Sequence, residues 1–193
     1  MSQVRFEISM SLDGYVTGTN PRPEEPMGEG GQILHQWAFD ADDAGRRVLA
    51  ESEDTVGASI AGRRTYDHVI DSWGPDGPGF ERRTPTFIVS HSMPDNVPDN
   101  GVYTFVATPE EAAERARVAA GTKDVDVFSA GIGQQLLRAG LVDEVRIHLV
   151  PVLLGSGTRL IGDLGGAQVR LERIAAFDSA MATHLRYAVV ASS

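Results

Sequence analysis

Val56-Gly57-Ala58-Ser59-Ile60-Ala61-Gly62-Arg63-Arg64-Thr65-Tyr66 reads as a short apolar strand that ends in glycine and passes directly into a helix. The stretch Asp126-Val127-Phe128-Ser129-Ala130-Gly131-Ile132-Gly133-Gln134-Gln135 shows the same order farther along the chain. A helix N-terminus offers unpaired N–H groups and the positive end of the helix dipole, which favours a phosphate. Two such junctions in one chain predict a ligand with more than one phosphate group, such as a dinucleotide.

Strand and helix patterns alternate around these junctions. We expect strands at 4–10, 55–61, 86–90, 102–106, 125–129 and 142–150. We expect helices at 42–54, 63–70, 109–120 and 131–139. The alternation predicts an α/β fold with a mostly parallel sheet and helices on both faces, and the final segments, 169–177 and 181–190, read as an antiparallel hairpin. Ligands of open parallel sheets bind at the carboxyl ends of the strands, where both glycine junctions fall.

Composition limits the function classes. The chain has 193 residues, which suits one domain over 1–193, and Gly- and Pro-rich stretches at 17–32 and 71–84 are expected to be loops within it. A net charge of −10 argues against nucleic-acid binding. The chain has no cysteine, which excludes disulfides and cysteine zinc sites, and its histidines lack metal-ligand spacing. Without a long apolar run or a signal-peptide pattern, we expect no membrane contact and a cytoplasmic location.

Five motifs in the same order make the chain resemble a known group of enzymes. They are Ser11–Tyr15, Gly62–Tyr66, Ala130-Gly131, Gly140–Val145 and Pro151–Gly157. The chain resembles the dihydrofolate-reductase-like superfamily, and most closely the C-terminal reductase domain of the bifunctional riboflavin-biosynthesis deaminase–reductase, without the deaminase half. The resemblance implies a dihydrofolate-reductase-like three-layer fold, NADPH as the hydride donor and often a homodimer.

The substrate motifs of two parent enzymes are mixed in this chain. Tyr15 stands where the riboflavin-pathway reductase usually has lysine, and Gly62–Tyr66 is closer to the folate reductases. The resemblance implies an NADPH-dependent reductase of a small heterocyclic or ribosylamino-pyrimidine-like substrate, similar to 5-amino-6-(5-phosphoribosylamino)uracil reductase. The alternatives are a dihydrofolate- or pterin-type reductase and a non-catalytic NADP-binding module.

The cofactor-binding residues are expected at the two junctions and at one further strand end. Arginine offers a rigid fork of donors for a phosphate, and small residues let a pyrophosphate approach the backbone. The candidates are Gly62, Arg63, Arg64, Thr65, Ser90, His91, Ala130, Gly131, Ile132 and Gly133. Each group also has an explanation without a ligand. Residues 62–65 could be a solvated helix start, residues 90–91 a turn before Pro94, and residues 130–133 a glycine-bearing helix start of a kind common in α/β proteins.

The strand end at Ser90 and His91 bears on the choice of cofactor. The resemblance implies contact with the adenosine 2′-phosphate here. No acid stands at this strand end, and an acid would bind a free ribose hydroxyl and repel a phosphate. NADPH is therefore favoured over NADH.

Asp13 is the candidate catalytic residue, because reduction of a C=N or C=O bond needs a proton as well as a hydride. The alternative is that Asp13-Gly14 serves only as a tight turn.

The candidate substrate-side residues are Trp37, Asp40, Gly155, Ser156 and Gly157. His35 and Trp37 could both line a pocket, with a satisfied or exposed position as the alternative for His35. Val145, Ile147 and Leu149 share one face of a strand and are the basis for a homodimer through the C-terminal half.

Overall fold

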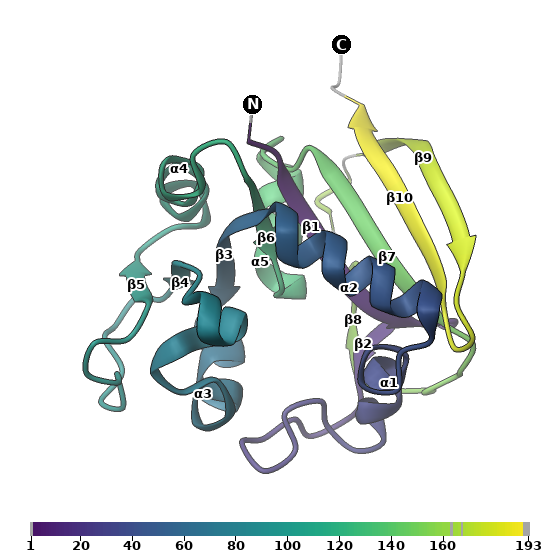
Figure 1. Ribbon diagram of the computed structural model, residues 1–193, viewed down its shortest axis with the longest axis horizontal. Helices are drawn as coiled ribbons and strands as arrows, with labels where there is room; N and C mark the ends of the chain where they lie inside the picture. Colours follow the sequence, from purple (N-terminus) through teal and green to yellow (C-terminus); the bar gives the residue numbers. More distant parts are fainter. Residues whose placement is uncertain (1, 163, 167, 191–193) are drawn as a thin grey trace.

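The computed structural model describes residues 2–162, 164–166 and 168–190. The strands of its main sheet are β1 (Val4–Ser11), β3 (Val56–Gly62), β4 (Thr86–Val89), β5 (Tyr103–Val106), β6 (Asp124–Val127), β7 (Glu144–Val150), β9 (Arg170–Asp178) and β10 (Thr183–Val190). They lie in the order β5-β4-β3-β6-β1-β7-β10-β9 (Figure 1). The strands from β5 to β7 run parallel, whereas β10 is antiparallel to both β7 and β9. The C-terminal hairpin therefore extends one side of a parallel sheet.

Helices cover both faces of this sheet (Figure 1). They are α1 (Gln36–Phe39), α2 (Asp43–Thr55), α3 (Arg63–Trp73), α4 (Pro109–Ala120) and α5 (Ala130–Arg138), with the 3-10 helices η1 (Gly31–His35) and η2 (Gly74–Arg82). Helices α4 and α5 pack on the largest apolar cluster, whereas α1, α2 and α3 pack on the opposite face. The predicted fold class is confirmed. No helix of the described residues is both long and apolar enough to cross a membrane.

Several short elements are not predicted by the sequence. η2 occupies most of the expected loop at 71–84, and η1 begins at the end of the expected loop at 17–32 and is followed by α1. A separate two-stranded sheet joins β2 (Tyr15–Thr17) to β8 (Thr158–Arg159). These two strands are too short for alternation to show, and their pairing brings together residues 144 positions apart. Such an element depends on tertiary contacts rather than on local pattern.

Alternation along β1 gives the sheet an apolar face and a polar face. Phe6 belongs to the apolar cluster under α4 and α5 and is fully buried, while Arg5 and Glu7 point to the side of α2. The Arg5 side chain is also fully buried, and its Nε donates to Asp126 Oδ1 at 2.9 Å. Because an unpaired charge in the interior is costly, this ion pair is what lets an arginine occupy the centre of the sheet.

A chain of hydrogen bonds continues from Glu7 through two buried histidines. Glu7 Oε1 lies 3.1 Å from His148 Nε2, His148 Nδ1 lies 2.8 Å from His184 Nδ1, and His184 Nε2 lies 2.9 Å from Ser179 Oγ. Burial opposes the charge on Glu7, but the hydrogen bond and charge of His148, with nearby arginines, lower its pKa to about 2. The polar layer under α2 is therefore held by specific partners rather than by apolar packing.

Candidate active site

The two glycine junctions lie side by side, because β3 and β6 pair in parallel. The Gly62 N–H donates to Ser129 Oγ at 2.8 Å, and Thr65 Oγ1 lies 2.7 Å from the same hydroxyl. Ser129 thus connects the first turns of α3 and α5. It is absent from the candidates chosen from the sequence, although its position directly before Ala130, at a helix N-cap, is a signal that could have identified it.

The first turn of α5 is open to a ligand. No side chain of the described residues caps its N–H groups, because the Ser129 hydroxyl is used by Gly62 and Thr65. Gly131 is exposed, and a Cβ built on it would meet no described atom within 4 Å. Uncapped N–H groups beside an open glycine suit an anion.

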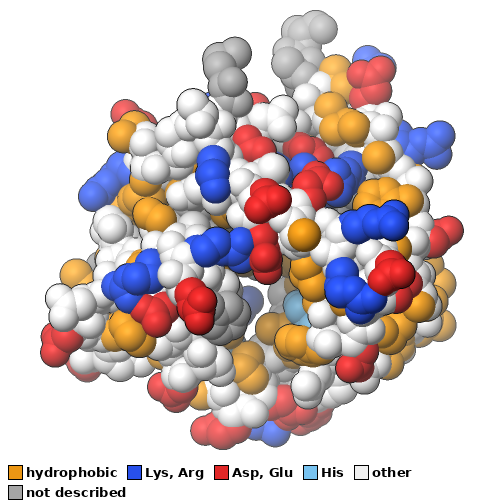
Figure 2. Space-filling model, in the orientation of Figure 1, with side chains coloured by type: hydrophobic (Ala, Val, Ile, Leu, Met, Phe, Trp, Pro, Cys, Tyr) orange, Lys and Arg blue, Asp and Glu red, His pale blue; other side chains and the backbone are white. Residues whose placement is uncertain are grey.

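A cleft of about 110 Å³ adjoins these junctions and is lined by Arg64, Ala130 and Gly131 from the cofactor candidates. Figure 2 shows a hollow on this face, between α3 and the loop before α1, with a histidine side chain on its wall. Thr17, His35, His68 and Thr158 supply further polar groups to the cleft. The sequence did not select Thr17, His68 or Thr158 as site residues, because single threonines and histidines carry no local signal of their tertiary neighbours.

The two arginines of α3 have different surroundings. Arg64 is exposed and has no hydrogen bond or ion pair with any residue that the structure describes. Arg63 reaches the loop after β4, with Nη1 3.1 Å from the Ser92 carbonyl oxygen and 3.4 Å from Ser90 Oγ. His91 is exposed in the same loop. Arg63 therefore lies beside Ser90, whereas Arg64 lines the cleft.

Ile132 and Gly133 lie on the packed side of α5. Both are buried, and the Ile132 side chain lies 3.1 Å from the place of a Cβ on Gly62. A Cβ on Gly133 would lie 2.4 Å from the Phe6 ring. Gly133 is thus required for contact between helix and sheet, and any contact of Ile132 or Gly133 with a cofactor would be through the backbone alone.

Asp13 connects the turn after β1 to the loop after β7. Its carboxylate accepts hydrogen bonds from Ser11 Oγ at 2.6 Å, from the Leu154 N–H at 3.1 Å and from the Gly155 N–H at 2.7 Å. The hydrogen bond from Ser11, with those from the backbone, lowers the pKa of Asp13. Asp13 does not line the cleft. These contacts support the turn interpretation, and the catalytic role stays a prediction.

Trp37 and Asp40 also lie off the wall of this cleft. Trp37 is buried, donates from Nε1 to Ser9 Oγ at 2.9 Å, and packs on His148 with ring centroids 4.2 Å apart. Asp40 is exposed at the end of α1. The observed contacts give Trp37 a packing role in the polar layer, and the substrate-side positions of Trp37 and Asp40 stay predictions.

Gly155, Ser156 and Gly157 form an exposed loop that reaches the cleft through the next residue, Thr158. Gly157 has a φ of 135°, and a Cβ there would lie 1.9 Å from the Thr17 carbonyl oxygen. Only glycine allows this approach to β2.

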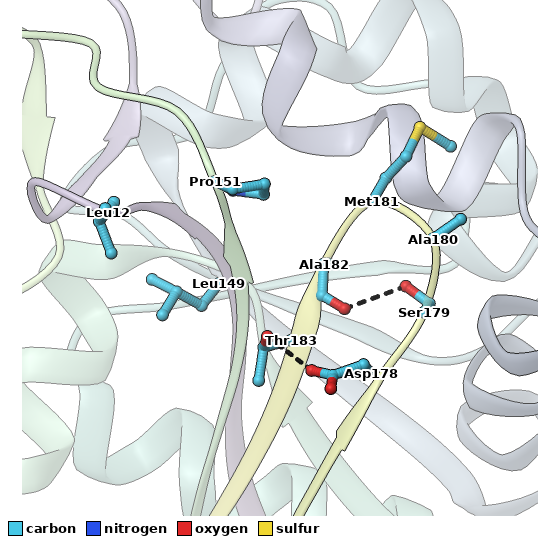
Figure 3. Close-up of a pocket in the computed structure, with 9 residues that line it drawn as sticks. All are labelled: Leu12, Leu149, Pro151, Asp178, Ser179, Ala180, Met181, Ala182 and Thr183. Atoms are coloured by element: carbon cyan, nitrogen blue, oxygen red, sulfur yellow. Dashed lines mark hydrogen bonds between the residues drawn. The ribbon is translucent and has the colours of Figure 1, made fainter.

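A second cavity, of about 330 Å³, lies at the β9–β10 turn beside Leu12 and Pro151 (Figure 3). Ser179 Oγ donates to the Ala182 carbonyl oxygen at 3.2 Å, and Thr183 Oγ1 donates to Asp178 Oδ1 at 2.8 Å. The side-chain hydroxyls of this cavity are therefore bonded within the hairpin, and the Ala180 N–H donates to Asp42 Oδ2 at 2.8 Å. The smaller cleft is the better candidate active site, because it is lined by Arg64, which pairs with no described residue, and by the open start of α5.

Residues 2–183 match the family model described as the RibD C-terminal domain. The chain belongs to this family. A relative in Bacillus subtilis (strain 168), the uncharacterized protein YwjB, is 27% identical over 179 residues, covering 92% of this chain and 93% of the relative.

Solved structures share the fold. A Shewanella sp. PV-4 protein with a provisional riboflavin-biosynthesis description matches with a TM-score of 0.71 and 24% identity, over 99% of this chain and 100% of that one. A diaminohydroxyphosphoribosylaminopyrimidine deaminase/5-amino-6-(5-phosphoribosylamino)uracil reductase from Thermotoga maritima matches with a TM-score of 0.66 and 12% identity, over 98% of this chain and 57% of that one. At these identities the comparison establishes the fold alone.

Reductases of this family typically use NAD(P)H. The cleft fits a phosphate-bearing dinucleotide on two observations of this chain. Arg64, on the cleft wall, has no ion-pair partner among the described residues, and the start of α5, which no described side chain caps, is open at Gly131. Both features favour an anion at the carboxyl ends of β3 and β6.

Proposed function

We propose that this protein is an NADPH-dependent reductase of a small heterocyclic substrate related to 5-amino-6-(5-phosphoribosylamino)uracil. The observation that carries the proposal is the cleft in which Arg64 meets the open N-terminus of α5. Arg64 and the first turn of α5 would hold the cofactor pyrophosphate, and Gly131 would allow its approach. Arg63, with the loop at 90–92, would hold the adenosine 2′-phosphate.

Bound NADPH would supply a hydride to an unsaturated carbon of the substrate. The protein would orient the reacting groups and exclude water from them. The ribosylamino-pyrimidine class is favoured by family membership, and a pterin substrate is the alternative from the motif at Gly62–Tyr66. A non-catalytic NADP-binding module is the third possibility, since Asp13 is engaged in the turn.

Calorimetric titration with NADPH, with NADH as the control, tests the cofactor assignment. We expect micromolar binding of NADPH and much weaker binding of NADH. Loss of NADPH absorbance with 5-amino-6-(5-phosphoribosylamino)uracil, compared with dihydrofolate, then tests the reaction. Binding without oxidation of NADPH by either substrate would favour the non-catalytic module, and no binding of NADPH or NADH would overturn the reductase proposal.

Gly131→Asp is expected to weaken NADPH binding by about 100-fold. The added carboxylate would stand at the start of α5 and repel the pyrophosphate, and a few kcal/mol of repulsion corresponds to this factor. Gly131→Ala is the matched control, because its Cβ enters open space. Calorimetry on both variants checks the prediction. Binding by the Gly131→Asp variant as tight as that of the parent would show that the pyrophosphate lies elsewhere.

We also propose a homodimer through the C-terminal half, but not through the expected face of β7, because Val145 is buried in the apolar cluster and Ile147 packs against it. β9 is an edge strand of the main sheet and carries two exposed apolar side chains, Leu171 and Ile174, with 45% and 58% exposure. Exposed edges of this kind favour pairing with another chain. Light scattering should give twice the mass of one chain for the parent protein. The double variant Leu171→Lys with Ile174→Lys should give the mass of a single chain. A monomeric parent protein at micromolar concentration would contradict the proposal.

A further inference from the structure

His35 is the residue on the cleft wall with the most unusual surroundings. It is the last residue of η1 and lines the same cleft as Ala130 and Gly131. Neither carboxylate chosen from the sequence, Asp13 or Asp40, lines that cleft. Among the residues that do line the cleft, His35 is therefore a candidate for contact with the reacting bond.

The two ring nitrogens of His35 differ. Nδ1 is closed off from solvent and has no hydrogen-bond partner among the described residues. A buried N–H without a partner is rarer in proteins than a buried acceptor without one. The hydrogen of the neutral ring therefore belongs on Nε2, which is not among the buried atoms without a partner, and we infer that this N–H points into the cleft that His35 lines.

The surroundings also fix the charge of the ring. Burial, and then the charge of His148 on β7, lower the pKa of His35 to about 4. Arg64 and His68 of α3 line the same cleft and add no negative charge. His35 is therefore neutral at physiological pH and presents a single N–H donor.

We propose that His35 donates a hydrogen bond from Nε2 to the heteroatom of the substrate bond that is reduced, and so orients and polarises that bond. The inference rests on the proposed reductase function. A hydride adds to the carbon of the C=N or C=O bond, the π electron pair moves to the heteroatom, and NADP⁺ remains. Water supplies the proton, because a neutral imidazole keeps its N–H. The donor stabilises the charge that develops on the heteroatom.

Two substitutions test the donor. His35→Leu removes it at similar size, and His35→Gln keeps an N–H donor. With NADPH and 5-amino-6-(5-phosphoribosylamino)uracil we expect kcat to fall about 100-fold for His35→Leu and to stay within about ten-fold for His35→Gln, the effect typical of one lost donor. Calorimetric NADPH binding by each variant shows whether the cleft is intact. Equal kcat for the parent and His35→Leu, or equal loss in both variants, would overturn the proposal.

Nitrogen NMR of the His35 ring gives a readout that does not need turnover. We expect the neutral ring with its hydrogen on Nε2, and we expect the ring to stay neutral down to about pH 5, whereas an ordinary histidine titrates near pH 6.5. An Nδ1–H tautomer or an ordinary pKa would contradict the inference even in an active reductase. If the parent protein binds NADPH but reduces no substrate, the reductase function itself fails, and the catalytic role of His35 fails with it.

Discussion

Replacement of Gly133 by alanine is expected to lower the free energy of unfolding by about 2 to 3 kcal/mol, the usual cost of overpacking a core. The new Cβ would lie 2.4 Å from the nearest atoms of the Phe6 ring. Phe6 is fully buried in the apolar cluster under α5, where close packing resists movement of the ring. The helix must therefore move away from the sheet, against the small gain in helix propensity that alanine brings.

Gly131→Ala is the control for this prediction, because the two glycines lie in the first turns of the same helix. Its Cβ meets no described atom within 4 Å, so the change should be neutral or should stabilise the protein by up to about 1 kcal/mol. Urea unfolding of the parent and both variants measures the difference. Equal stability of the two variants would mean that α5 does not pack on Phe6 as described.

Arg5→Leu is expected to lower the free energy of unfolding by about 3 to 5 kcal/mol at pH 8. The change leaves the Asp126 carboxylate without the guanidinium that lies 2.9 Å away, in a place where both side chains are buried. Burial, with the nearby charge of Glu7, already raises the pKa of Asp126, and Arg5 acts against this rise. In the variant Asp126 should therefore bind a proton more readily, and the stability difference from the parent should shrink as the pH falls through that raised pKa.

The double variant Arg5→Met with Asp126→Leu is the control for charge. It removes both ions and keeps most of the buried volume, so it should recover most of the lost stability. Urea midpoints at pH 8 and pH 6 test both parts of the prediction. If the Arg5→Leu variant is as stable as the parent at pH 8, the ion pair between Arg5 and Asp126 does not stabilise this part of the sheet.

Local pattern was a good guide to the sheet and to one wall of the cleft. The segments at 55–61, 63–70, 125–129 and 131–139 became β3, α3, β6 and α5 with shifts of a few residues. The sequence also placed Arg64, Ala130 and Gly131 on the cleft, because parallel strands carry their following loops to one edge. It could not assign different environments to Arg63 and Arg64, which depend on the loop after β4.

The other wall of the cleft was beyond local pattern. Thr17 and Thr158 come together only when β2 pairs with β8. Trp37 read as a pocket residue, because a tryptophan in a loop gives no sign that it will pack on His148. The alternation of Arg5 and Glu7 in β1 indicated a strand but not that its polar face would be covered by α2.

The sequence by itself determined the α/β class, the family and the two glycine junctions, since strand and helix periodicity and the need for glycine at a close approach are properties of neighbouring residues. Only the tertiary structure decided that Gly131 is open and Gly133 is packed, and that His35 lines the cleft with its Nδ1 closed off from solvent. The physical reason is that burial and partnership depend on atoms distant in the chain. Gly131 and Gly133 differ by two positions, and a ring contributed by β1 separates their roles.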